Sequence, residues 1–316
     1  ITGRHLIDVN LGYISKAPSI RNTFTNARQN NAVSIGLESE KIQNVDIGYI
    51  FRSAIVKARI TGFYSNFKGG SDLGFYFTEN ISGLGLEQDA FIQEVMTNVE
   101  KQYIGGELGI EAQVTPTIKL KGAASMGQYT YSNSPNLYIT SDDLKGPVSF
   151  GNGTTKLKNY HVAGGPERAY QLGIEYRDPK FWWVGLTTNY YSNAYLDINN
   201  LARSDNFSSD FDGQPFNNYD SEVAKELLKQ EKFDDYFLVN VTGGKSWKIK
   251  QYYIGFFVSI NNALDQEYVT GGFEQGRKSN YRDLKEDKLL EYGPIFGPRY
   301  FFGTGGSYYV NVYVRF

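Results

Sequence analysis

Ser307-Tyr-Tyr-Val-Asn-Val-Tyr-Val-Arg-Phe316, the last ten residues of the chain, alternate strictly between two kinds of side chain. One face carries Tyr308, Val310, Val312, Val314 and Phe316, and the other carries Tyr309, Asn311, Tyr313 and Arg315. A period of two predicts a β-strand whose two sides meet different surroundings. The apolar face runs to the final residue, where a soluble domain usually frays into a polar tail. Two interpretations follow: the closing strand of a membrane barrel, or the last strand of a soluble sandwich.

The overall composition excludes helical membrane spans and permits a barrel. Hydrophobic residues make up 41% of the 316 residues, and the mean hydropathy is −0.43. No run of about 18 apolar residues exists, as a spanning helix would require. A barrel is compatible with these values because its interior positions are polar. The 25 Tyr and 21 Phe are many for a soluble protein and would supply two interfacial girdles.

The charge balance and the absence of cysteine exclude further classes of function. The 32 basic and 34 acidic residues give a net charge of −2, and no basic block stands out, so we expect no nucleic-acid partner. Absence of Cys removes disulfides, thiolate metal sites and cysteine catalysis. The chain starts at Ile1 inside a strand-like pattern without an initiator Met or an apolar signal segment. We therefore expect it to be the C-terminal part of a longer protein.

Alternating segments along the chain predict ten strands. They cover residues 6–14, 43–52, 55–67, 102–114, 118–131, 170–177, 181–191, 237–244, 252–261 and 307–316. No Lys, Arg, Asp or Glu lies on the apolar faces of these ten segments. An exposed sheet face in a soluble protein would be charged, whereas Arg or Lys facing mid-bilayer lipid costs about 2–4 kcal/mol.

The connections between these strands alternate between two lengths. Short ones lie at Ser53-Ala54, Thr115–Thr117, Asp178–Lys180 and around Trp247–Ile249. The others run for roughly thirty to forty-five residues, against a usual median of about 4–6. Tight turns alternating with long loops are typical of an outer-membrane barrel. If the tight turns are periplasmic, Phe316 lies at the periplasmic rim and the long loops are extracellular.

Five segments resemble TonB-dependent outer-membrane receptors, in particular the Bacteroidota type with an N-terminal carboxypeptidase-regulatory-like domain. They are Gly12–Ser19, Leu37–Tyr49, Ile60–Phe67, Ser259–Tyr268 and Tyr308–Phe316. The second is similar to a Leu-Lys-Pro-Glu-like loop end followed by a Glu-Leu-Gly-Tyr strand, and the fourth to Asn-Asn-Leu-Phe-Asp-x-x-Tyr. Ser39, Asp46, Ala263 and Leu264 depart from these patterns. The order of the segments also matches the family.

The resemblance implies an all-β, antiparallel transmembrane barrel of twenty-two strands in the bacterial outer membrane. Residues 1–316 would be its final ten strands, with the signal peptide, TonB box, plug and early strands outside this sequence. The implied function is import of a nutrient: siderophore, cobalamin, glycan or peptide. The implied partners are membrane lipid, TonB, the plug domain and the barrel assembly machinery. The resemblance implies that this machinery recognises an insertion signal on the terminal strand, formed by Tyr308, Val310, Val312, Val314 and Phe316. An alternative is a scaffold barrel that docks a surface lipoprotein without transport.

The chain lacks the residues that catalysis requires, so we expect that the protein is not an enzyme. His5 and His161 are the two histidines, and only His161 falls in an extracellular loop. A closed ten-stranded barrel protease would need a carboxylate beside it. Residues 160–165 supply none, so His161 is predicted to be a loop-surface or loop-packing residue.

The segment Asp205–Gly213 is a weak candidate for a structural Ca²⁺ site, and no other cofactor is expected. Asp205, Asp210 and Asp212 are hard oxygen ligands, although their spacing is not that of an EF-hand. The alternative is a solvated acidic loop. The residues that follow, Ser221–Lys232, predict a short helix capped by Asp220 or Ser221 and packed on the loops.

Substrate contact is expected from aromatic and amide side chains at the extracellular strand ends and loops. The candidates are Tyr129, Tyr131, Asn189, Tyr191 and Tyr195. The alternative for them is the outer aromatic girdle. Charged residues predicted to face the interior should pair with the plug, with one another or with water; these are Asp8, Asp46, Lys57, Arg59, Glu107, Glu111, Lys119, Lys121, Glu175 and Arg315.

Overall fold

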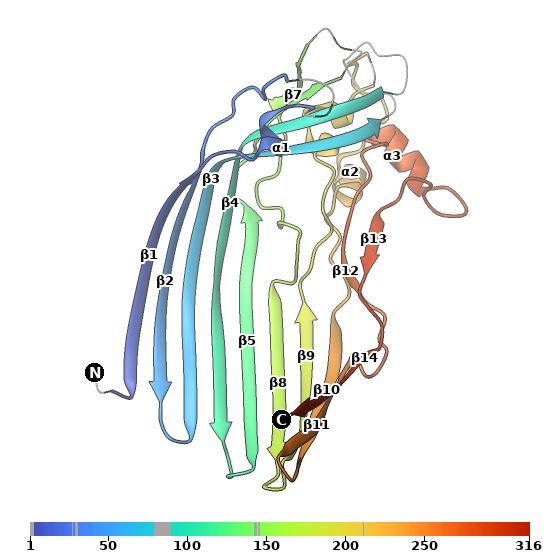
Figure 1. Ribbon diagram of the computed structural model, residues 1–316. Coiled ribbons are helices and arrows are strands. Elements are labelled where there is room, and N and C mark those ends of the chain that lie inside the picture. The colour runs from blue at the N-terminus through green and yellow to red at the C-terminus, as the bar shows by residue number, and fades with distance from the viewer. Residues whose placement is uncertain are drawn as a thin grey trace.

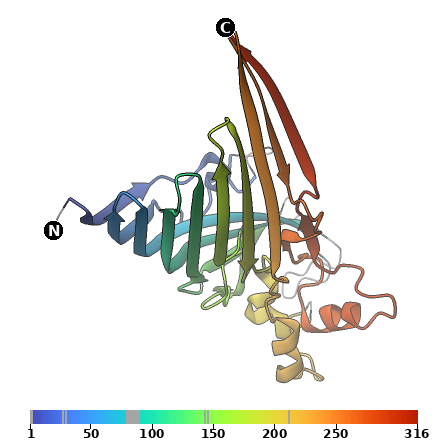
Figure 2. The ribbon, with the colours of Figure 1, turned by 90° about the horizontal axis from the view of Figure 1, so that it is seen from below.

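Ten long strands form one curved antiparallel sheet in chain order in the computed structural model (Figure 1). The structure describes residues 3–26, 28, 31–78, 90–141, 144, 146–210 and 212–316. The ten strands are β1 (His5–Lys16), β2 (Glu40–Arg52), β3 (Val56–Thr78), β4 (Ala90–Gln113), β5 (Ile118–Tyr131), β8 (Arg168–Arg177), β9 (Trp182–Ser192), β10 (Tyr236–Ile249), β11 (Tyr252–Asn261) and β14 (Ser307–Arg315). Figure 2 shows the sheet curling from the N-terminal to the C-terminal edge. The ten predicted strands are confirmed.

The two ends of the sheet differ in the predicted way (Figure 1). Tight turns join β2 to β3, β4 to β5, β8 to β9 and β10 to β11 at one end, here called the turn end. Long connections gather at the other, called the loop end. One of the four predicted tight turns is misplaced: β10 continues to Ile249, which pairs with Tyr252, so the turn is Lys250-Gln251. Lys250 has a φ of 54°, the left-handed conformation that such tight turns use.

The loop end carries short elements of its own. They are α1 (Ile20–Thr23), β6 (Asn136–Thr140), β7 (Val148–Thr154), η1 (Leu201–Arg203), η2 (Asp205–Ser208), α2 (Ser221–Leu227), β12 (Val269–Phe273), α3 (Tyr281–Lys288) and β13 (Arg299–Phe302). The predicted helix is confirmed as α2, whose Asp220 carboxylate accepts from the N–H groups of Glu222 and Val223, although it ends five residues early. None of the described helices is long and apolar enough to span a membrane.

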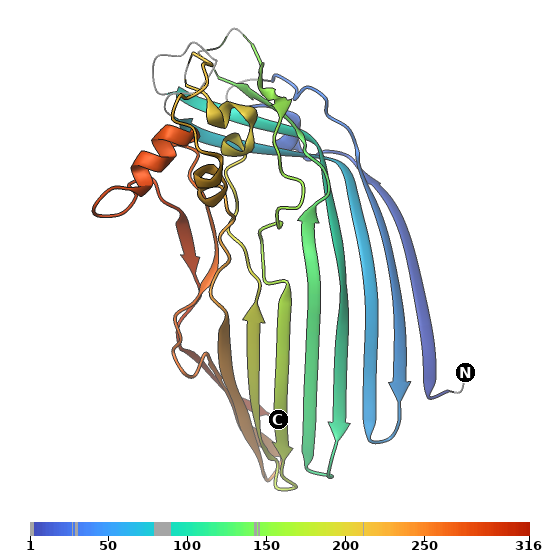
Figure 3. The same cartoon turned by 180° about the vertical axis from the view of Figure 1, so that it is seen from behind.

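The connection between β3 and β4 is not the unstructured loop that the alternation predicts. The two strands have 23 and 24 residues, about twice the 9–11 that cross a bilayer, so their outer halves extend beyond it. This outer hairpin bends over the loop end (Figure 3). The register shifts between Phe67 and Gly70 and again before Asp72, a bulge that interrupts the period-two pattern. For this reason the sequence pattern ends where the strands continue.

The register across the strands separates an apolar face from a polar face. Tyr49 of β2 lies opposite Ile7 of β1 and Ile60 of β3 on the apolar face. On the polar face Arg59 donates to Asp8 at 3.0 Å across two strands. Directly opposed residues in antiparallel strands point to the same side, so each face stays uniform from edge to edge.

Charged residues reach the apolar face only where the observed strands exceed the predicted ones. Lys41 and Lys68, which lie opposite each other, and Arg168 do so at the loop end. Lys245 does so near the turn end, opposite Trp182 and Phe256, and its Nζ lies 5.4 Å from the centre of the Trp247 ring. Long cationic side chains near the ends of a spanning segment reach the interface with their charge.

The buried hydrophobic residues lie at the loop end and not within the sheet. Ile92, Leu137, Ile139, Leu157 and Leu201 are fully buried and pack together between the outer hairpin and the loops. A second cluster joins Phe207, Phe216 and Ala224 to Tyr281 of α3. The spanning part of the sheet buries no comparable cluster among the described residues and leaves its apolar face exposed.

We expect that an arginine at the centre of the apolar face prevents folding in a membrane, while one on the polar face is tolerated. Leu186 and Thr187 are neighbours in β9 on opposite faces. Leu186→Arg should cost about 2–4 kcal/mol, because it places a charge in lipid. Thr187→Arg is the matched control. Folding into lipid vesicles along a urea series measures the difference, and equal losses for the two variants would contradict the assignment of faces.

Candidate functional site

Aromatic side chains line the polar face where the strands reach the loop end. Phe67, Tyr103 and Tyr129 form a row across β3, β4 and β5, with ring centres 5.0 and 4.8 Å apart. Tyr191 and Tyr236 form a second pair on β9 and β10, with ring centres 5.1 Å apart. We call these five residues the aromatic belt. All five are half-buried, so each ring keeps an accessible surface.

The register assigns the belt to the interior-facing side of the sheet. Tyr129 lies opposite Tyr103, on the same face as Glu107 and Lys121. Tyr191 lies opposite Tyr236 and next to Asn189 on that face. The sequence alternative for Tyr129 and Tyr191, an outward girdle, is therefore wrong.

Three loop residues extend the belt between β5 and β9. The Glu167 carboxylate accepts from the Tyr129 N–H at 2.8 Å and lies 2.8 Å from Nδ1 of His161. The His161 ring stacks on Tyr195, with ring centres 3.8 Å apart and planes 9° apart. Burial, then the negative charge of Glu167, raises the pKa of the Tyr195 phenol.

His161 therefore has a loop-packing role, as the sequence predicts, but with a partner that the sequence analysis missed. Glu167 lies six residues further on, just before β8, and its side chain is 3% exposed. Glu167 lies outside the segment 160–165, and the loop folds back so that this later residue reaches the ring. A carboxylate beside a histidine is also the pair that a barrel protease would need, but here Tyr195 covers one face of the His161 ring.

The remaining candidate residues have separate positions. Asn189 is buried and accepts from the Gln171 amide at 3.0 Å on the polar face. Tyr131 is 7% exposed and packs in the loop-end cluster with Leu137, with the Lys101 ammonium 5.3 Å from its ring centre. Tyr131 therefore packs in the loop-end cluster, and Asn189 forms part of the polar face of the sheet.

The three aspartates of the predicted Ca²⁺ loop do not come together. Asp205 pairs with Lys156 and accepts from Asn152, and the bond to Lys156 holds the pKa of that carboxyl below its usual range. Asp210 accepts from the N–H groups of Asp212 and Gln214 within its own turn. Over the described ranges, no three His, Asp or Glu side chains gather as metal ligands. The Ca²⁺ site stays a prediction without geometric support.

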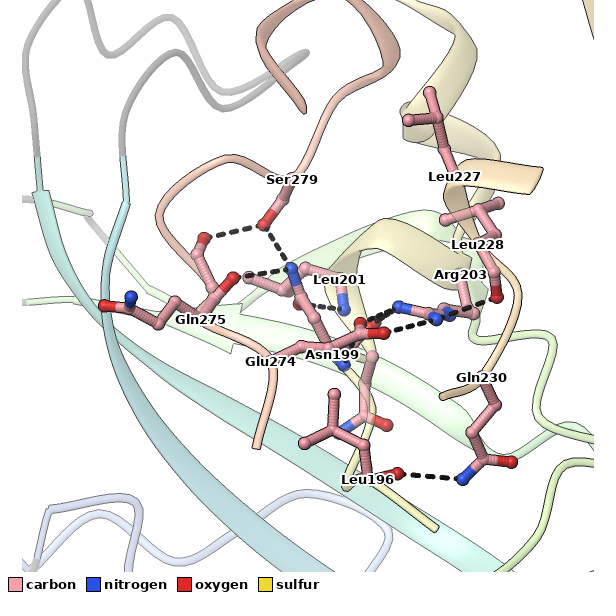
Figure 4. A network of polar contacts seen from close by, with 12 residues as sticks. Leu196, Asn199, Leu201, Arg203, Leu227, Leu228, Gln230, Glu274, Gln275 and Ser279 are labelled. Carbon is pink, nitrogen blue, oxygen red and sulfur yellow. Dashed lines mark hydrogen bonds and ion pairs between the residues drawn. The ribbon is translucent and has the colours of Figure 1, made fainter. Parts of the chain in front are cut away.

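A buried ion pair ties together the two longest loops at the loop end (Figure 4). The Arg203 guanidinium, 2% exposed, donates to both oxygens of Glu274 and to the Leu228 carbonyl oxygen at 2.9 Å. Asn199 donates to Ser279 at 2.9 Å in the same network. Arg203 lies between β9 and β10, and Glu274 between β11 and β14. The pair therefore ties the loop between β9 and β10 to the loop between β11 and β14.

The predicted insertion residues form the outer surface of the last strand. Their partners on β11 are apolar: Tyr308 faces Ile260, Val310 faces Val258, Val312 faces Phe256 and Val314 faces Ile254. These four β14 residues and Phe316 are exposed, Phe316 at 96%. Such a surface requires lipid or a further apolar cover.

An antiparallel sheet with an apolar outer face, a polar inner face and long loops at one end defines an outer-membrane barrel protein. The family model described as "TonB dependent receptor-like, beta-barrel" matches residues 8–263, and the chain belongs to this family. Members of the family are bacterial outer-membrane proteins. The comparison does not distinguish the Bacteroidota type, which stays a prediction.

Solved structures show the same fold. The copper transporter OprC is 15% identical, with a TM-score of 0.55 over 99% of this chain and 37% of its own. The ferric enterobactin receptor PfeA of Pseudomonas aeruginosa, solved as a double mutant, is 13% identical, with a TM-score of 0.54 over 99% and 38%. BauA, the ferric preacinetobactin receptor of Acinetobacter baumannii, is 14% identical, with a TM-score of 0.51 over 99% and 34%. No curated protein sequence matches the chain.

We expect the Arg203–Glu274 pair to hold the loops in place. Arg203→Met should free them at a cost of about 3 kcal/mol, because it leaves a half-buried carboxylate without its partner. Hydrogen exchange should accelerate in residues 199–206 and 272–280. Arg21→Met, an exposed arginine in α1, is the control and should change nothing. Unchanged exchange in Arg203→Met would show that apolar packing alone positions the loops.

Proposed function

We propose that this chain is the C-terminal barrel portion of a TonB-dependent transporter that imports a nutrient across the outer membrane. The observation that carries the proposal is the aromatic belt on the polar face of a sheet whose long loops are tied together by a buried ion pair, in a chain of this receptor family. The chain spans 34–38% of the length of the three solved structures named above, so the plug and TonB contacts would come from other parts of the receptor.

In this proposal the solute enters between the loops and meets the belt before it reaches the plug. Aromatic rings bind flat or apolar solutes by stacking, and their hydroxyl groups add hydrogen bonds. Further down, acids and bases of the polar face are already paired, at 3.0 Å for Lys119 with Glu111 and 3.1 Å for Lys121 with Glu175. Because these charged side chains of the polar face already pair with one another, the plug could move along this face without leaving charges unpaired.

The proposed orientation places the turn end and Phe316 in the periplasm and the loops outside the cell. Among the described residues β1 pairs only with β2, and β14 only with β11. An open sheet edge is not tolerated in lipid, because its backbone groups have no partners. Further strands of the complete barrel would close both edges, and the outward residues of β14 would serve as the signal for the assembly machinery.

The substrate class stays open among siderophore, cobalamin, glycan and peptide. The similar structures are named for copper and for ferric siderophores, which describes those proteins. Growth of a deletion strain on single limiting nutrients, with and without TonB, tests the transport proposal. A TonB-dependent growth defect on at least one nutrient is expected. Normal growth on all of them would favour a scaffold that docks a surface lipoprotein.

Once a nutrient is identified, we expect Tyr129→Ala to weaken its binding about tenfold, equivalent to about 1.4 kcal/mol. Tyr129→Phe keeps the ring and should bind within about twofold, because stacking supplies most of this contact. Tyr292→Ala removes an exposed loop tyrosine, 96% accessible, and is the control. Binding to the purified receptor measures all three. Equal affinities of the Tyr129→Ala and Tyr292→Ala variants for the nutrient would show that the belt does not take part in binding.

A further inference from the structure

A groove indents the apolar face of the sheet where β9, β10 and β11 lie side by side. Its volume is about 520 Å³. Most of the side chains that line it belong to the apolar face, among them Trp182, Val184, Val241, Lys245, Phe256 and Val258. The groove therefore opens on the outward side of the sheet, and the aromatic belt lies on the opposite side.

A glycine in the middle strand creates the groove. Gly243 of β10 lies between Val184 of β9 and Val258 of β11. A Cβ at Gly243 would lie 3.1 Å from the carbonyl oxygen of Trp183, so the close approach of the two strands favours glycine at this position. The rows on either side carry full side chains; they are Trp182–Lys245–Phe256 and Leu186–Val241–Ile260. The side chain that glycine lacks leaves the space that these two rows enclose.

The length of the groove corresponds to one leaflet of a bilayer. From Val241 to Lys245 the strand β10 advances by about 14 Å, at about 3.4 Å per residue. The hydrocarbon core of a bilayer is about 30 Å thick, so one leaflet contributes about 15 Å. An acyl chain laid along the groove would therefore contact apolar side chains over most of its length.

Lys245 supplies a positive charge at the end of the groove that lies nearer the turn. Its side chain is half-buried, and its Nζ lies 5.4 Å from the centre of the Trp247 ring, two residues closer to the turn. None of the ion pairs between described residues includes Lys245. A cation on a lipid-facing surface is costly, and an anion from outside the chain would stabilise it.

Asp178, in the turn between β8 and β9, is an acid whose charge interacts with that of Lys245, but it has closer partners. Its carboxylate accepts from the Lys180 N–H at 2.8 Å and from the Tyr176 hydroxyl at 2.9 Å. These two hydrogen bonds, and after them the charges of Lys180 and Lys245, hold the pKa of Asp178 below its usual range. The Lys245 ammonium therefore stays available to an anion that approaches from the lipid side.

Aromatic rings around Lys245 indicate the level of the lipid headgroups. The ring centres of Tyr176 and Trp182 are 5.0 Å apart, and those of Trp247 and Phe256 are 5.8 Å apart. Trp182 and Trp247 remain 36% and 43% exposed, so both can contact lipid. Indole rings favour the membrane interface, where the ring contacts acyl chains and the N–H donates to polar oxygens. Lys245 thus lies where the headgroups of one leaflet meet its acyl chains.

We propose that the groove binds one anionic phospholipid of the leaflet at the turn end, with an acyl chain along Gly243 and the phosphate beside Lys245. The phosphate accepts a charge-assisted hydrogen bond from the ammonium, which gives the headgroup its specificity. Burial of the chain is non-directional and adds affinity without selecting a headgroup. The proposal depends on the outer-membrane family of the chain and not on transport. In the proposed orientation the leaflet is the periplasmic one.

The test uses the full-length receptor in vesicles that mix phosphatidylglycerol with phosphatidylcholine of identical acyl chains. One of the two lipids carries brominated chains, which quench the fluorescence of a tryptophan that they contact. Each receptor is measured with and without Trp182→Phe, so that the difference is the signal from the groove. We expect phosphatidylglycerol to bind about fivefold more tightly than phosphatidylcholine. Equal binding would overturn the proposal, and so would a lack of quenching by either lipid, because protein would then cover the groove.

Substitutions of Lys245 test the headgroup contact. Lys245→Gln should abolish the preference for phosphatidylglycerol, whereas Lys245→Arg keeps the charge and should keep the preference. Lys248→Gln removes the same charge from the polar face of the same strand, where its Nζ lies 5.5 Å from the centre of the Tyr253 ring, and is the matched control. A preference that persists in Lys245→Gln would overturn the role assigned to Lys245.

A larger side chain in the groove tests the acyl-chain contact. Val258→Phe places a ring beside Gly243 and should reduce the quenching of Trp182 by both lipids, because it fills the space for the chain. Leu172→Phe makes a similar change on the apolar face of β8, at a residue that is 70% exposed and outside the groove. Both variants keep an apolar side chain in lipid, so we expect the fold to be kept. Equal quenching in the two variants would show that the groove is not the site.

Discussion

The continuous antiparallel register is the constraint on which the rest of the structure depends. Every strand must pair on both sides in lipid, because no water is present to satisfy its backbone groups. Pairing of directly opposed residues then carries the period of two from strand to strand, so Ile7, Tyr49 and Ile60 stay on one face. The opposite face is left to acids and bases that pair across strands, such as Asp8 with Arg59. Composition alone cannot show that the two faces differ, since the hydropathies of the apolar and polar faces average to a hydrophilic mean.

Packing at the loop end has a different physical basis. There the hairpin of β3 and β4 offers apolar residues such as Ile92, and the loops bury it with Leu157 and Leu201. Polar contacts then set the positions of the loops on that core: Asn200 reaches Glu94, and Arg203 reaches Glu274. The loops are held by specific bonds between segments about 70–110 residues apart. A surface fixed in this way loses little entropy when a solute binds, which favours affinity.

What the sequence could predict follows from the range of the interactions involved. Alternation is local, so all ten strands and the start of α2 could be read from it. The bulge at Gly70 broke the alternation, and the outer halves of β3 and β4 were therefore missed. Glu167 beside His161, and Glu274 beside Arg203, depend on how a loop returns to the sheet, and no local pattern encodes that return. Of the belt, the sequence predicts Tyr129 and Tyr191 as contact residues but not Phe67, Tyr103 or Tyr236, because their common side of the sheet follows only from the register.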